Sequence, residues 1–353
     1  MTDKQPIVIA IDAMGGDHAP DCVIGGLKRA SEKFGYIRFL IFGDEKKVRP
    51  CIDKYGLSAD VYTFVHTDNA VPPDEKPGVA LRTRRESSMW MAIESVKDGR
   101  ASAVVSSGNT GALMALSKII LGTLPAIHRP AILAQMPTRH GVCTCLDLGA
   151  NAQCDARNLV EFAVMGEVFS RVVMGKKVPT VALLNIGSER TKGLDEIKEA
   201  AEILENSHSD TREFKGFVEA DQIGENVVDV IVSDGFSGNV MLKAIEGTAK
   251  LILRMFKDFR GSGVWGFLSF VFAIPILLKL KKKMDPRLYN GGMLIGLKGI
   301  SIKSHGGTDE IGFANAVGVA VHTVEKDLLG QITENISKIV FPEAEAQNAP
   351  EEA

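Results

Sequence analysis

Short apolar runs rich in β-branched residues alternate with longer stretches of helical periodicity along most of the chain. Five of these runs end in Gly, Asn, Ser or Asp, and a helical pattern follows each of them. The runs begin at residues 7, 101, 141, 180 and 227. Strands that alternate with helices predict βαβ units and a mostly parallel sheet. Right-handed crossovers would then place all five strand-to-helix loops at the same edge of that sheet.

The predicted loops are rich in glycine and in short polar side chains. Any one of them could be only a helix N-cap and a turn, because Ser, Asn and Gly are favoured there. Five such loops at the edge where open α/β sheets bind ligands indicate a binding site. The loop residues are Asp12, Gly15, Gly16, Asp17, Ser106, Ser107, Gly108, Asn109, Thr110, Asp147, Gly149, Asn151, Asn185, Gly187, Glu189, Asp234, Gly235, Ser237, Gly238 and Asn239.

The sequence favours a small anion as the ligand of these loops. Helix N-termini offer free N–H groups and a partial positive charge. The sequence has no G-x-x-x-x-G-K-[ST] motif and no G-x-G-x-x-G after a strand, so neither a P-loop nor a dinucleotide site is predicted. A free anion such as phosphate fits the loops better, and Lys192 could supply a point charge beside it.

Signatures of nucleophilic or metal-assisted hydrolysis do not occur in the sequence. There is no G-x-S-x-G elbow and no H-E-x-x-H pair. His305 is kept as a candidate because Gly306 and Gly307 mark another tight loop beside it. Carboxylates such as Asp12 and Asp234 could bind Mg²⁺ or cap helices, and the pattern does not separate these roles. No metal site is predicted.

A proline-rich loop and a basic cluster separate the first two units. Pro72, Pro73 and Pro77 make residues 65–78 a loop. Three arginines then open a predicted helix whose apolar face is formed by Met89, Ile93 and Val96. The cluster could be a solvated basic face or a docking patch for an acidic partner or an anionic substrate. Its members are Arg82, Arg84 and Arg85.

Residues 263–284 form an apolar stretch followed by lysines. Glycine, serine and proline interrupt it, so a membrane-spanning helix is not expected. The pattern favours a membrane-associating helical hairpin over residues 256–286, with aromatic side chains at the headgroup boundary and lysines against anionic lipid. A buried helix pair at a dimer interface is the alternative. The membrane-facing candidates are Trp265, Phe267, Phe270, Phe272, Lys281 and Lys282.

Composition narrows the class of protein further. The 353 residues carry a net charge of −3, with 45% hydrophobic and 24% charged residues. This is typical of a globular protein and argues against nucleic-acid binding, for which a basic excess is expected. The first residues do not form a signal peptide, so a cytoplasmic location is expected. Residues 1–341 are predicted as a single α/β domain, and residues 342–353 as a disordered acidic tail.

Six motifs in order resemble the PlsX family of acyl-acyl carrier protein:phosphate acyltransferases. They are "DAMGGDHAP", "VVSSGNTGALMA", "DLGAN", "LLNIGSERTKG", "DGFSGNVMLKAIEG" and "HGGTDEIGFANAV". The resemblance covers residues 7–335. It implies a three-layer α/β/α sandwich similar to isocitrate and isopropylmalate dehydrogenases and to phosphotransacetylase. Ser107 stands where alanine is expected in many relatives.

The resemblance also implies an activity and its partners. The family transfers a long acyl chain from acyl carrier protein to inorganic phosphate, as a homodimer without a cofactor, at the inner surface of the bacterial cell membrane. A glycerol 3-phosphate acyltransferase then uses the acyl-phosphate in phospholipid synthesis. Phosphate is its own nucleophile in this reaction, so the protein needs only to position it and to stabilise an oxyanion.

These implications assign expected roles to the loop residues. Lys192 and the backbone of Gly108, Asn109 and Thr110 are expected to hold phosphate. Asn239, beside Gly238, is expected to donate to phosphate or to the thioester oxygen, while Asp12 and Asp234 orient these groups. The arginine cluster becomes a docking site for acyl carrier protein, which is acidic. The remaining substrate-binding candidates are Asn151, Asn185 and His305.

Three other functions compete with this interpretation. A phosphate acetyltransferase would use a coenzyme A thioester on the same fold. A non-catalytic membrane scaffold would explain the apolar stretch but not the polar loops. An NAD-dependent decarboxylating dehydrogenase would require a dinucleotide signature that the sequence lacks.

Overall fold

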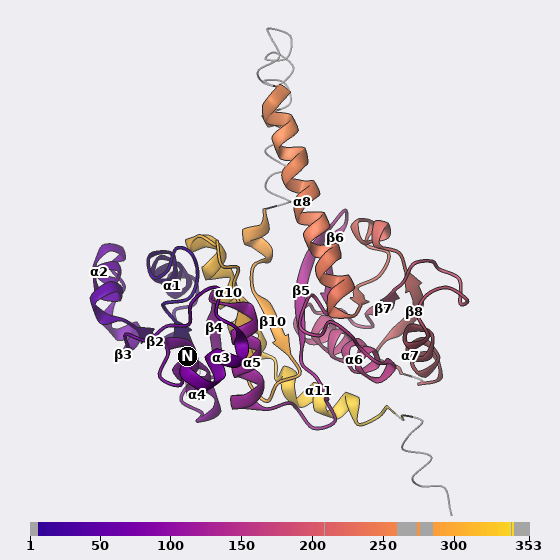
Figure 1. The fold of residues 1–353 in the computed structure, drawn as a ribbon, viewed down its shortest axis with the longest axis horizontal. Helices are drawn as coiled ribbons and strands as arrows, with labels where there is room; N and C mark the ends of the chain where they lie inside the picture. Colours follow the sequence, from indigo (N-terminus) through magenta and orange to yellow (C-terminus); the bar gives the residue numbers. More distant parts are fainter. Residues whose placement is uncertain (1–5, 208, 260–273, 276–284, 340, 342–353) are drawn as a thin grey trace, which may run out of the picture.

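The computed structural model describes residues 6–207, 209–259, 274–275, 285–339 and 341. These residues form an eleven-stranded sheet with helices on both faces (Figure 1). The strands are β1 (Ile7–Asp12), β2 (Ile37–Gly43), β3 (Tyr62–His66), β4 (Ala103–Ser106), β5 (Ala131–Thr138), β6 (Gly141–Leu146), β7 (Thr180–Leu184), β8 (Glu213–Val218), β9 (Val230–Val232), β10 (Gly292–Ile295) and β11 (Ile300–Lys303). The helices are α1 (Asp21–Lys33), α2 (Glu45–Tyr55), α3 (Pro77–Thr83), α4 (Ser88–Lys97), α5 (Thr110–Leu121), α6 (Ala156–Val172), α7 (Asp195–Asn206), α8 (Gly235–Phe259), α10 (Glu310–Glu325) and α11 (Leu328–Ile336). Short 3₁₀ helices are η1 (Ala59–Val61), η2 (Ala220–Glu225) and η3 (Pro286–Tyr289).

The sheet consists of two parallel groups of strands that run in opposite directions. Its order is β3-β2-β1-β4-β11-β10-β5-β6-β9-β7-β8. From β3 to β11 all neighbours pair in parallel, as do β6, β9, β7 and β8. Between the groups, β10 pairs antiparallel with β11 and β5, and β5 pairs antiparallel with β6.

This reversal corrects one expectation from the sequence. All five predicted strand-to-helix units exist, as β1–α1, β4–α5, β6–α6, β7–α7 and β9–α8. The prediction that their loops share one edge is wrong. The loops after β1 and β4 leave one edge of the sheet, and those after β6, β7 and β9 leave the opposite edge, because the β5–β6 hairpin and the antiparallel β10 reverse the strand direction between them.

Alternating side chains place different helices on the two faces of the sheet. In β1, Ile9 and Ile11 pack into a core shared with α1, α10, α6, α7 and α11, while Ala10 packs into a second core with α3, α4 and α5. On the second face of the other half, Cys143 and Cys145 of β6 pack with Met241 of α8. The predicted three-layer α/β/α sandwich is confirmed.

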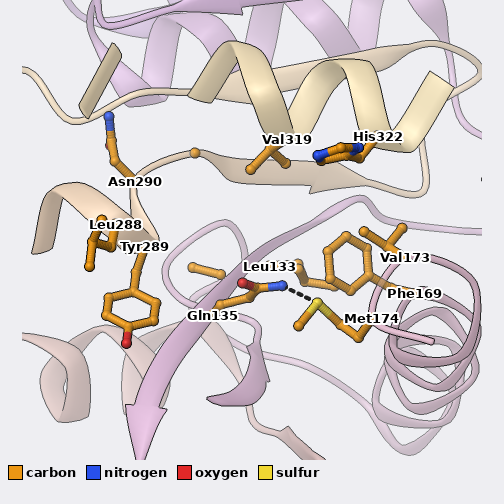
Figure 2. A pocket seen from close by; sticks show the side chains of 12 residues that line it. Leu133, Gln135, Phe169, Val173, Met174, Leu288, Tyr289, Asn290, Val319 and His322 are labelled. Atoms are coloured by element: carbon orange, nitrogen blue, oxygen red, sulfur yellow. Dashed lines mark hydrogen bonds between the residues drawn. The ribbon is translucent and has the colours of Figure 1, made fainter. Parts of the chain in front are cut away.

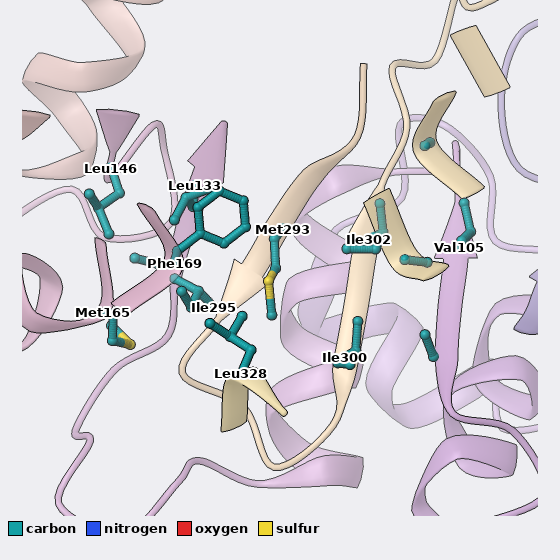
Figure 3. Packing of buried hydrophobic residues seen from close by; sticks show 14 of the residues in the cluster. Val105, Leu133, Leu146, Met165, Phe169, Met293, Ile295, Ile300, Ile302 and Leu328 are labelled. Carbon is teal, nitrogen blue, oxygen red and sulfur yellow. The ribbon is translucent and has the colours of Figure 1, made fainter. Parts of the chain in front are cut away.

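One continuous core crosses the boundary between the two groups of strands. Figure 3 shows Ile302 of β11, Met293 of β10 and Leu133 of β5 on the same face, with Phe169 of α6 beside Leu133. Phe169 is only 2% exposed, and burying such a side chain contributes about 1.5–3 kcal/mol. The core therefore fixes the two halves, and the loops that leave them, relative to each other.

The basic cluster lies at the end of a helix and not at its start. Arg82 is in the last turn of α3, and Arg84 is the C-cap residue of that helix. A second helix, α4, begins after Ser87, whose side chain accepts a hydrogen bond from Trp90 N. The prediction that the arginines open a helix is wrong, because Ser87 caps a new helix after them. Cations at a helix C-terminus complement the helix dipole.

The long helix α8 projects away from the rest of the molecule (Figure 1). Apolar side chains remain exposed along it, including Leu251 and Met255. The aromatic and lysine residues of the predicted hairpin, Trp265 to Lys282, lie outside the described residues, as does the tail 342–353. Among the helices that the structure describes, none is long and apolar enough to span a membrane.

Candidate functional site

The loops after β1, β4 and β11, called the first group below, start from a row of three residues. Asp12, Ser106 and Lys303 end β1, β4 and β11, and the strand register places them side by side. Asp12 Oδ1 accepts a hydrogen bond from Ser88 Oγ, and Asp12 Oδ2 accepts one from Ser106 Oγ, each at 2.6 Å. Met14 N donates to Oδ1 at 3.2 Å. The buried Asp12 carboxylate therefore holds β1, β4 and α4 together beneath the loops.

Glycine in the "DAMGGD" motif allows two of these loops to touch. A Cβ atom on Gly15 would lie 2.5 Å from Gly108 N and 2.6 Å from Asp12 Oδ2. Gly16 has a φ of +106°, and a Cβ there would lie 2.9 Å from Ser107 Cβ. Any larger residue would push the β1–α1 loop off the β4–α5 loop.

At the N-terminus of α5, hydrogen bonds within the protein occupy the side chain of Asn109. Asn109 Oδ1 accepts from Ala112 N at 3.0 Å, and its Nδ2 donates to the carbonyl oxygens of Pro73 and Glu75 at 2.8 and 2.9 Å. Gly108 N donates to Ser106 Oγ at 3.0 Å. The Asn109 side chain thus caps the helix and anchors the proline-rich loop. Among the described residues, none accepts a hydrogen bond from the backbone N of Thr110 or Gly111, so these two donors of the helix end are available to a ligand.

Lys303 was not among the residues that the sequence singled out. Its Nζ donates to Ser107 O at 3.3 Å and to Ser304 O. Burial lowers the pKa of Lys303 to about 8, although the nearby carboxylates of Asp12 and Asp17 act in the opposite direction. The available signal was a lysine that directly ends an apolar strand and precedes a Gly-Gly pair.

His305 lies in the same β11–α10 loop and is held as a neutral donor. Its Nδ1 accepts a hydrogen bond from Gly307 N at 3.1 Å, so a neutral ring carries its proton on Nε2. Burial lowers the pKa of His305, and the charge of Lys303 adds to this effect. The backbone N of His305 donates to Asn290 Oδ1 at 2.8 Å, which fixes the loop.

The loops after β6, β7 and β9, called the second group below, are built around the buried Asp147. Asp147 Oδ1 accepts from the backbone N atoms of Ile132, Gly149 and Ala150 at 2.9, 3.1 and 2.9 Å. Oδ2 accepts from Asn151 N and Nδ2 at 2.7 and 2.9 Å. Burial raises the pKa of Asp147 despite these donors. Asn151 also donates to Pro130 O at 2.8 Å, so its side chain is part of the loop frame.

The N-terminus of α8 packs directly on this frame. A Cβ on Gly235 would lie 2.8 Å from Asp147 Oδ2, so glycine is required at this position. Asp234 accepts from Ser237 N at 2.8 Å and from Ser237 Oγ at 2.7 Å, which makes it a cap of the first turn. Asn239 is exposed and lies beside Gly149, whose Cβ position would be 3.6 Å from the Asn239 side chain. Asn239 is the available polar side chain here.

Asn185 and Lys192 complete the second group. Asn185 Nδ2 donates to Lys192 O at 3.1 Å, and Asn185 Oδ1 accepts from Ile186 N at 2.9 Å. The buried Asn185 thereby shapes the β7–α7 loop. Lys192 is exposed, and no carboxylate of the described residues lies within ion-pair distance of its Nζ. Its charge is therefore available to a ligand.

The structure unites each group but separates the predicted phosphate ligands. Strand register sets Lys303 opposite Gly292 and places Asp147 beside Ile132. The two rows are thus offset by about 7 Å along the strands and about 14 Å across them. Lys192 lies in the β7–α7 loop, at the edge of the sheet opposite to the loop that carries Gly108, Asn109 and Thr110. Helix α8 connects the groups, because its N-terminus lies on Asp147 while Lys243, Glu246 and Lys250 influence the pKa of His305.

Comparison with known proteins identifies the family. A family model described as "Fatty acid synthesis protein" matches residues 7–330. The chain belongs to this family. A phosphate acyltransferase from Rhodospirillum rubrum is 50% identical over 336 residues, covering 95% of this chain and 96% of its own length. One from Rhodospirillum centenum is 50% identical over 348 residues, covering 99% and 98%. The resemblance to the PlsX family is confirmed.

Solved structures of other acyltransferases share the fold. A phosphotransacetylase from Streptococcus pyogenes superposes with a TM-score of 0.61 at 16% identity, covering 91% of this chain and 95% of its own. EutD phosphotransacetylase from Staphylococcus aureus gives a TM-score of 0.59 at 15% identity, covering 91% and 94%. The predicted similarity to the phosphotransacetylase fold is confirmed, and at these identities the likeness shows the fold alone.

The three arginines of the predicted docking patch differ in their availability. Arg84 Nε lies 3.1 and 2.9 Å from the carboxylate oxygens of Glu75, and Arg84 Nη2 lies 2.8 Å from Glu75 Oε1. Arg85 stacks over Trp90 at 5.9 Å and stays exposed, as does Arg82. Within the described part of the chain, neither Arg82 nor Arg85 is within ion-pair distance of a carboxylate. Two of the three positive charges thus face solvent.

A cavity of about 180 Å³, lined by both apolar and polar side chains, lies between β5, α6, α10 and the segment that precedes β10 (Figure 2). Leu133, Phe169 and Val319 are among the apolar side chains that line it. Asn290 stands at one end, and its Nδ2 donates to Ser304 Oγ and Gly312 O, each at 2.8 Å. Asn290 therefore joins the wall of the cavity to the loop that carries His305.

Proposed function

We propose that this chain transfers a long-chain acyl group from acyl-acyl carrier protein to inorganic phosphate and releases acyl-phosphate. The observation that carries the proposal is 50% identity, over 95% of this chain, to a protein named phosphate acyltransferase. A phosphate oxygen attacks the thioester carbon, and the carbon–sulfur bond breaks from the tetrahedral intermediate. The protein needs donors for phosphate and for the oxyanion, and the two groups of loops contain them.

The first group supplies uncharged donors. In the proposal, the free amides at the N-terminus of α5 and His305 Nε2–H contact phosphate or the oxyanion. The Nδ1 hydrogen bond from Gly307 N at 3.1 Å and the lowered pKa both favour the neutral ring in that role. A preorganised oxyanion donor is typically worth about 2.7–4 kcal/mol of barrier.

The second group supplies Lys192 and Asn239 in the proposal. Both are exposed, and neither side chain is consumed by a hydrogen bond in the described part of the chain. Lys192 lies at the edge of the sheet opposite to the N-terminus of α5. We therefore propose that it contacts substrate from the side of the molecule that carries α8. Asp12, Asp147 and Asp234 hold the loops by hydrogen bonds and act only on position.

The cavity beside Asn290 is proposed to receive part of the acyl chain. A dry apolar cavity of about 150 Å³ can hold a six-carbon ring, so the cavity of about 180 Å³ has room for a similar length of alkyl chain. Val319→Trp would fill it. We expect the variant to lose activity with long-chain donors while keeping activity with an acetyl donor. Equal losses with both donors would contradict this placement.

Acyl carrier protein is proposed to dock at Arg82 and Arg85. Charge reversal of both residues should weaken binding of the acidic carrier, and more so at low salt, where screening is weak. Arg84 already pairs with Glu75 and is excluded from the patch. An unchanged affinity of the double variant at low salt would contradict the docking site.

The cellular setting is also proposed from the family resemblance. A homodimer would peripherally contact the inner face of the cell membrane through residues 256–286 and pass acyl-phosphate to a glycerol 3-phosphate acyltransferase. Exposed apolar side chains on α8, such as Leu251 at 57%, support a partner surface there. Flotation with anionic and neutral vesicles tests the membrane contact, and sedimentation tests the dimer.

The deciding experiment is product analysis with two acyl donors. The purified protein is mixed with phosphate and with either palmitoyl-acyl carrier protein or acetyl coenzyme A. Acyl-phosphate from the first donor and little from the second supports the proposal. The reverse preference would favour a phosphate acetyltransferase, and no product from either would reject both.

A further inference from the structure

Lys303 occupies a position in the first group of loops that is unusual for a lysine. Its neighbour in β11 that faces the same side, Ser301, meets Ser117 of α5 through their hydroxyls at 3.1 Å. The Lys303 side chain therefore lies beneath α5, where only part of it reaches the surface. Two carbonyl oxygens, those of Ser107 and Ser304, accept hydrogen bonds from its ammonium group.

Charge pairing does not explain this lysine. Both oxygens of Asp12, the carboxylate in the same row, are taken by Ser88, Ser106 and Met14. No carboxylate of the described residues lies within 4 Å of Lys303 Nζ. Lysine side chains are mostly exposed, and this one is half-buried without such a partner. An apolar side chain would fill the site at lower cost, which indicates that the amine has a chemical role.

The reaction leaves one proton transfer unassigned, and this argument rests on the proposed function. Phosphate enters as a dianion that carries one proton, and acyl-phosphate leaves as a dianion without it. The sulfur leaves as a thiolate and becomes a thiol. One proton must therefore move from the phosphate oxygen to the sulfur during each turnover, and no external acid or base is consumed.

We propose that Lys303 carries this proton. The Lys303 ammonium donates a proton to the sulfur as the carbon–sulfur bond breaks, and the resulting neutral amine takes the proton of the phosphate hydroxyl. Lysine is thereby regenerated, and atoms and charge balance over the cycle.

The properties of the site agree with this role. A proton is passed most efficiently between groups of similar pKa near the working pH. Burial brings the pKa of Lys303 to about 8, near the value of about 8.5 for an ordinary thiol. The amine can therefore both give and accept the proton, whereas an unperturbed lysine would hold it.

The charged groups around Lys303 favour proton transfer over simple anion binding. Asp12 faces it from β1 and Asp17 from the β1–α1 loop, and both act on its pKa. Neutral His305 follows it in its own loop, and α8 brings Lys243, Glu246 and Lys250 toward His305. The two carboxylates offset the positive charge of the ammonium, so Lys303 is not a purely cationic anchor for phosphate, and they oppose in part the effect of burial on its pKa.

Steady-state kinetics of Lys303→Arg and Lys303→Met test the proposal. Arginine keeps the charge but does not release a proton at these pH values, and methionine keeps only the shape. We expect kcat to fall about 100-fold in both variants, with the KM for phosphate unchanged. Wild-type kcat should fall as pH rises through about 8, and Lys303→Arg should lack this limb. Lys298→Met, at the exposed turn before β11, is the matched control.

Each outcome decides the question. Wild-type kcat in a folded Lys303→Arg variant overturns the proposal, as does a loss that appears only in the KM for phosphate. Side-chain NMR titration of Lys303, assigned by its disappearance in Lys303→Met, gives a readout independent of activity. A titration near the ordinary value of about 10.4 overturns the proposal. Absence of acyl-phosphate from wild type would reject the proposed function instead.

Discussion

Asp12 and Asp147 occupy equivalent places in the two halves of the molecule, yet different donors satisfy them. Each ends or follows a central strand, is buried, and holds loops that carry candidate site residues. Asp12 accepts from two serine hydroxyls and one backbone amide, whereas Asp147 accepts from four backbone amides and the Asn151 side chain. Hydroxyls can turn to another acceptor, but backbone amides cannot. The second group of loops therefore depends more on its central carboxylate.

Removing the two carboxylates should give the largest difference between the halves. Asp147→Ala removes the acceptor that four backbone amides and the Asn151 side chain share, and we expect it to lower the free energy of unfolding by about 3–5 kcal/mol. Asp12→Ala should cost less, about 1–3 kcal/mol, because Ser88 and Ser106 can reorient. Urea unfolding of both variants gives the comparison. Equal losses would show that donor type does not matter.

A third carboxylate calibrates this comparison. Asp234 only caps the first turn of α8 through Ser237. Asp234→Ala should therefore cost about 1 kcal/mol, the usual value for an N-cap. A loss as large as that of Asp147→Ala would mean that the α8 start, and not Asp147, is the centre of the second group.

Much of both groups could be predicted from sequence because it depends on local pattern. The Gly and Asp positions of "DAMGGD", "DLGAN" and "DGFSGN" mark loops that do pack tightly, as Gly15 and Gly235 show. The direction of the strands could not be predicted in this way. It depends on the β5–β6 hairpin together with β10, which is only four residues long and pairs between segments far apart in the chain.

Individual roles were harder to predict, since they depend on partners that come from other elements. The motif predicts that the backbone of Asn109 holds phosphate, but it gives no sign that the Asn109 side chain donates to Pro73 O and Glu75 O of a distant loop. In the sequence, Lys303 is simply a polar residue at the end of a strand. Its pKa is lowered only by the packing of β1, β4 and α5 around it. Residue type gave the chemistry available, and tertiary contacts decided which groups are free.

The half-buried amine of Lys303 should make the stability of the folded protein depend on pH. Lys303 is proposed to titrate near pH 8 in the folded chain, against about 10.4 when unfolded. Between these values the unfolded state binds one more proton, so stability rises with pH relative to a variant without the amine. Comparing wild type with Lys303→Met at pH 7.5 and 10, we expect wild type to gain up to about 3 kcal/mol. A constant difference would contradict the shifted titration.

The exposed groups of the second half should affect rate without affecting stability. Lys192→Ala and Asn239→Ala should each lower turnover at least about tenfold, equivalent to about 1.4 kcal/mol of transition-state stabilisation. Their unfolding free energies should stay within about 0.5 kcal/mol of wild type, as for surface substitutions. A folded Lys192→Ala protein with normal rate and phosphate affinity would remove the lysine from the proposed site.

The smallest expected effect concerns two neighbouring serines in the first group. Ser106 Oγ donates to Asp12 and accepts from Gly108 N, whereas Ser107 Oγ is buried without a hydrogen-bond partner among the described residues. A buried hydroxyl without a partner lowers stability, so Ser107→Ala should raise the free energy of unfolding by up to about 1 kcal/mol. Ser106→Ala should lower it by about 1–2 kcal/mol, because the Asp12 carboxylate and Gly108 N both lose a partner. Thermal or urea unfolding of the pair separates the cases, and a loss of stability in Ser107→Ala would show that the hydroxyl makes a bond that stabilises the first group.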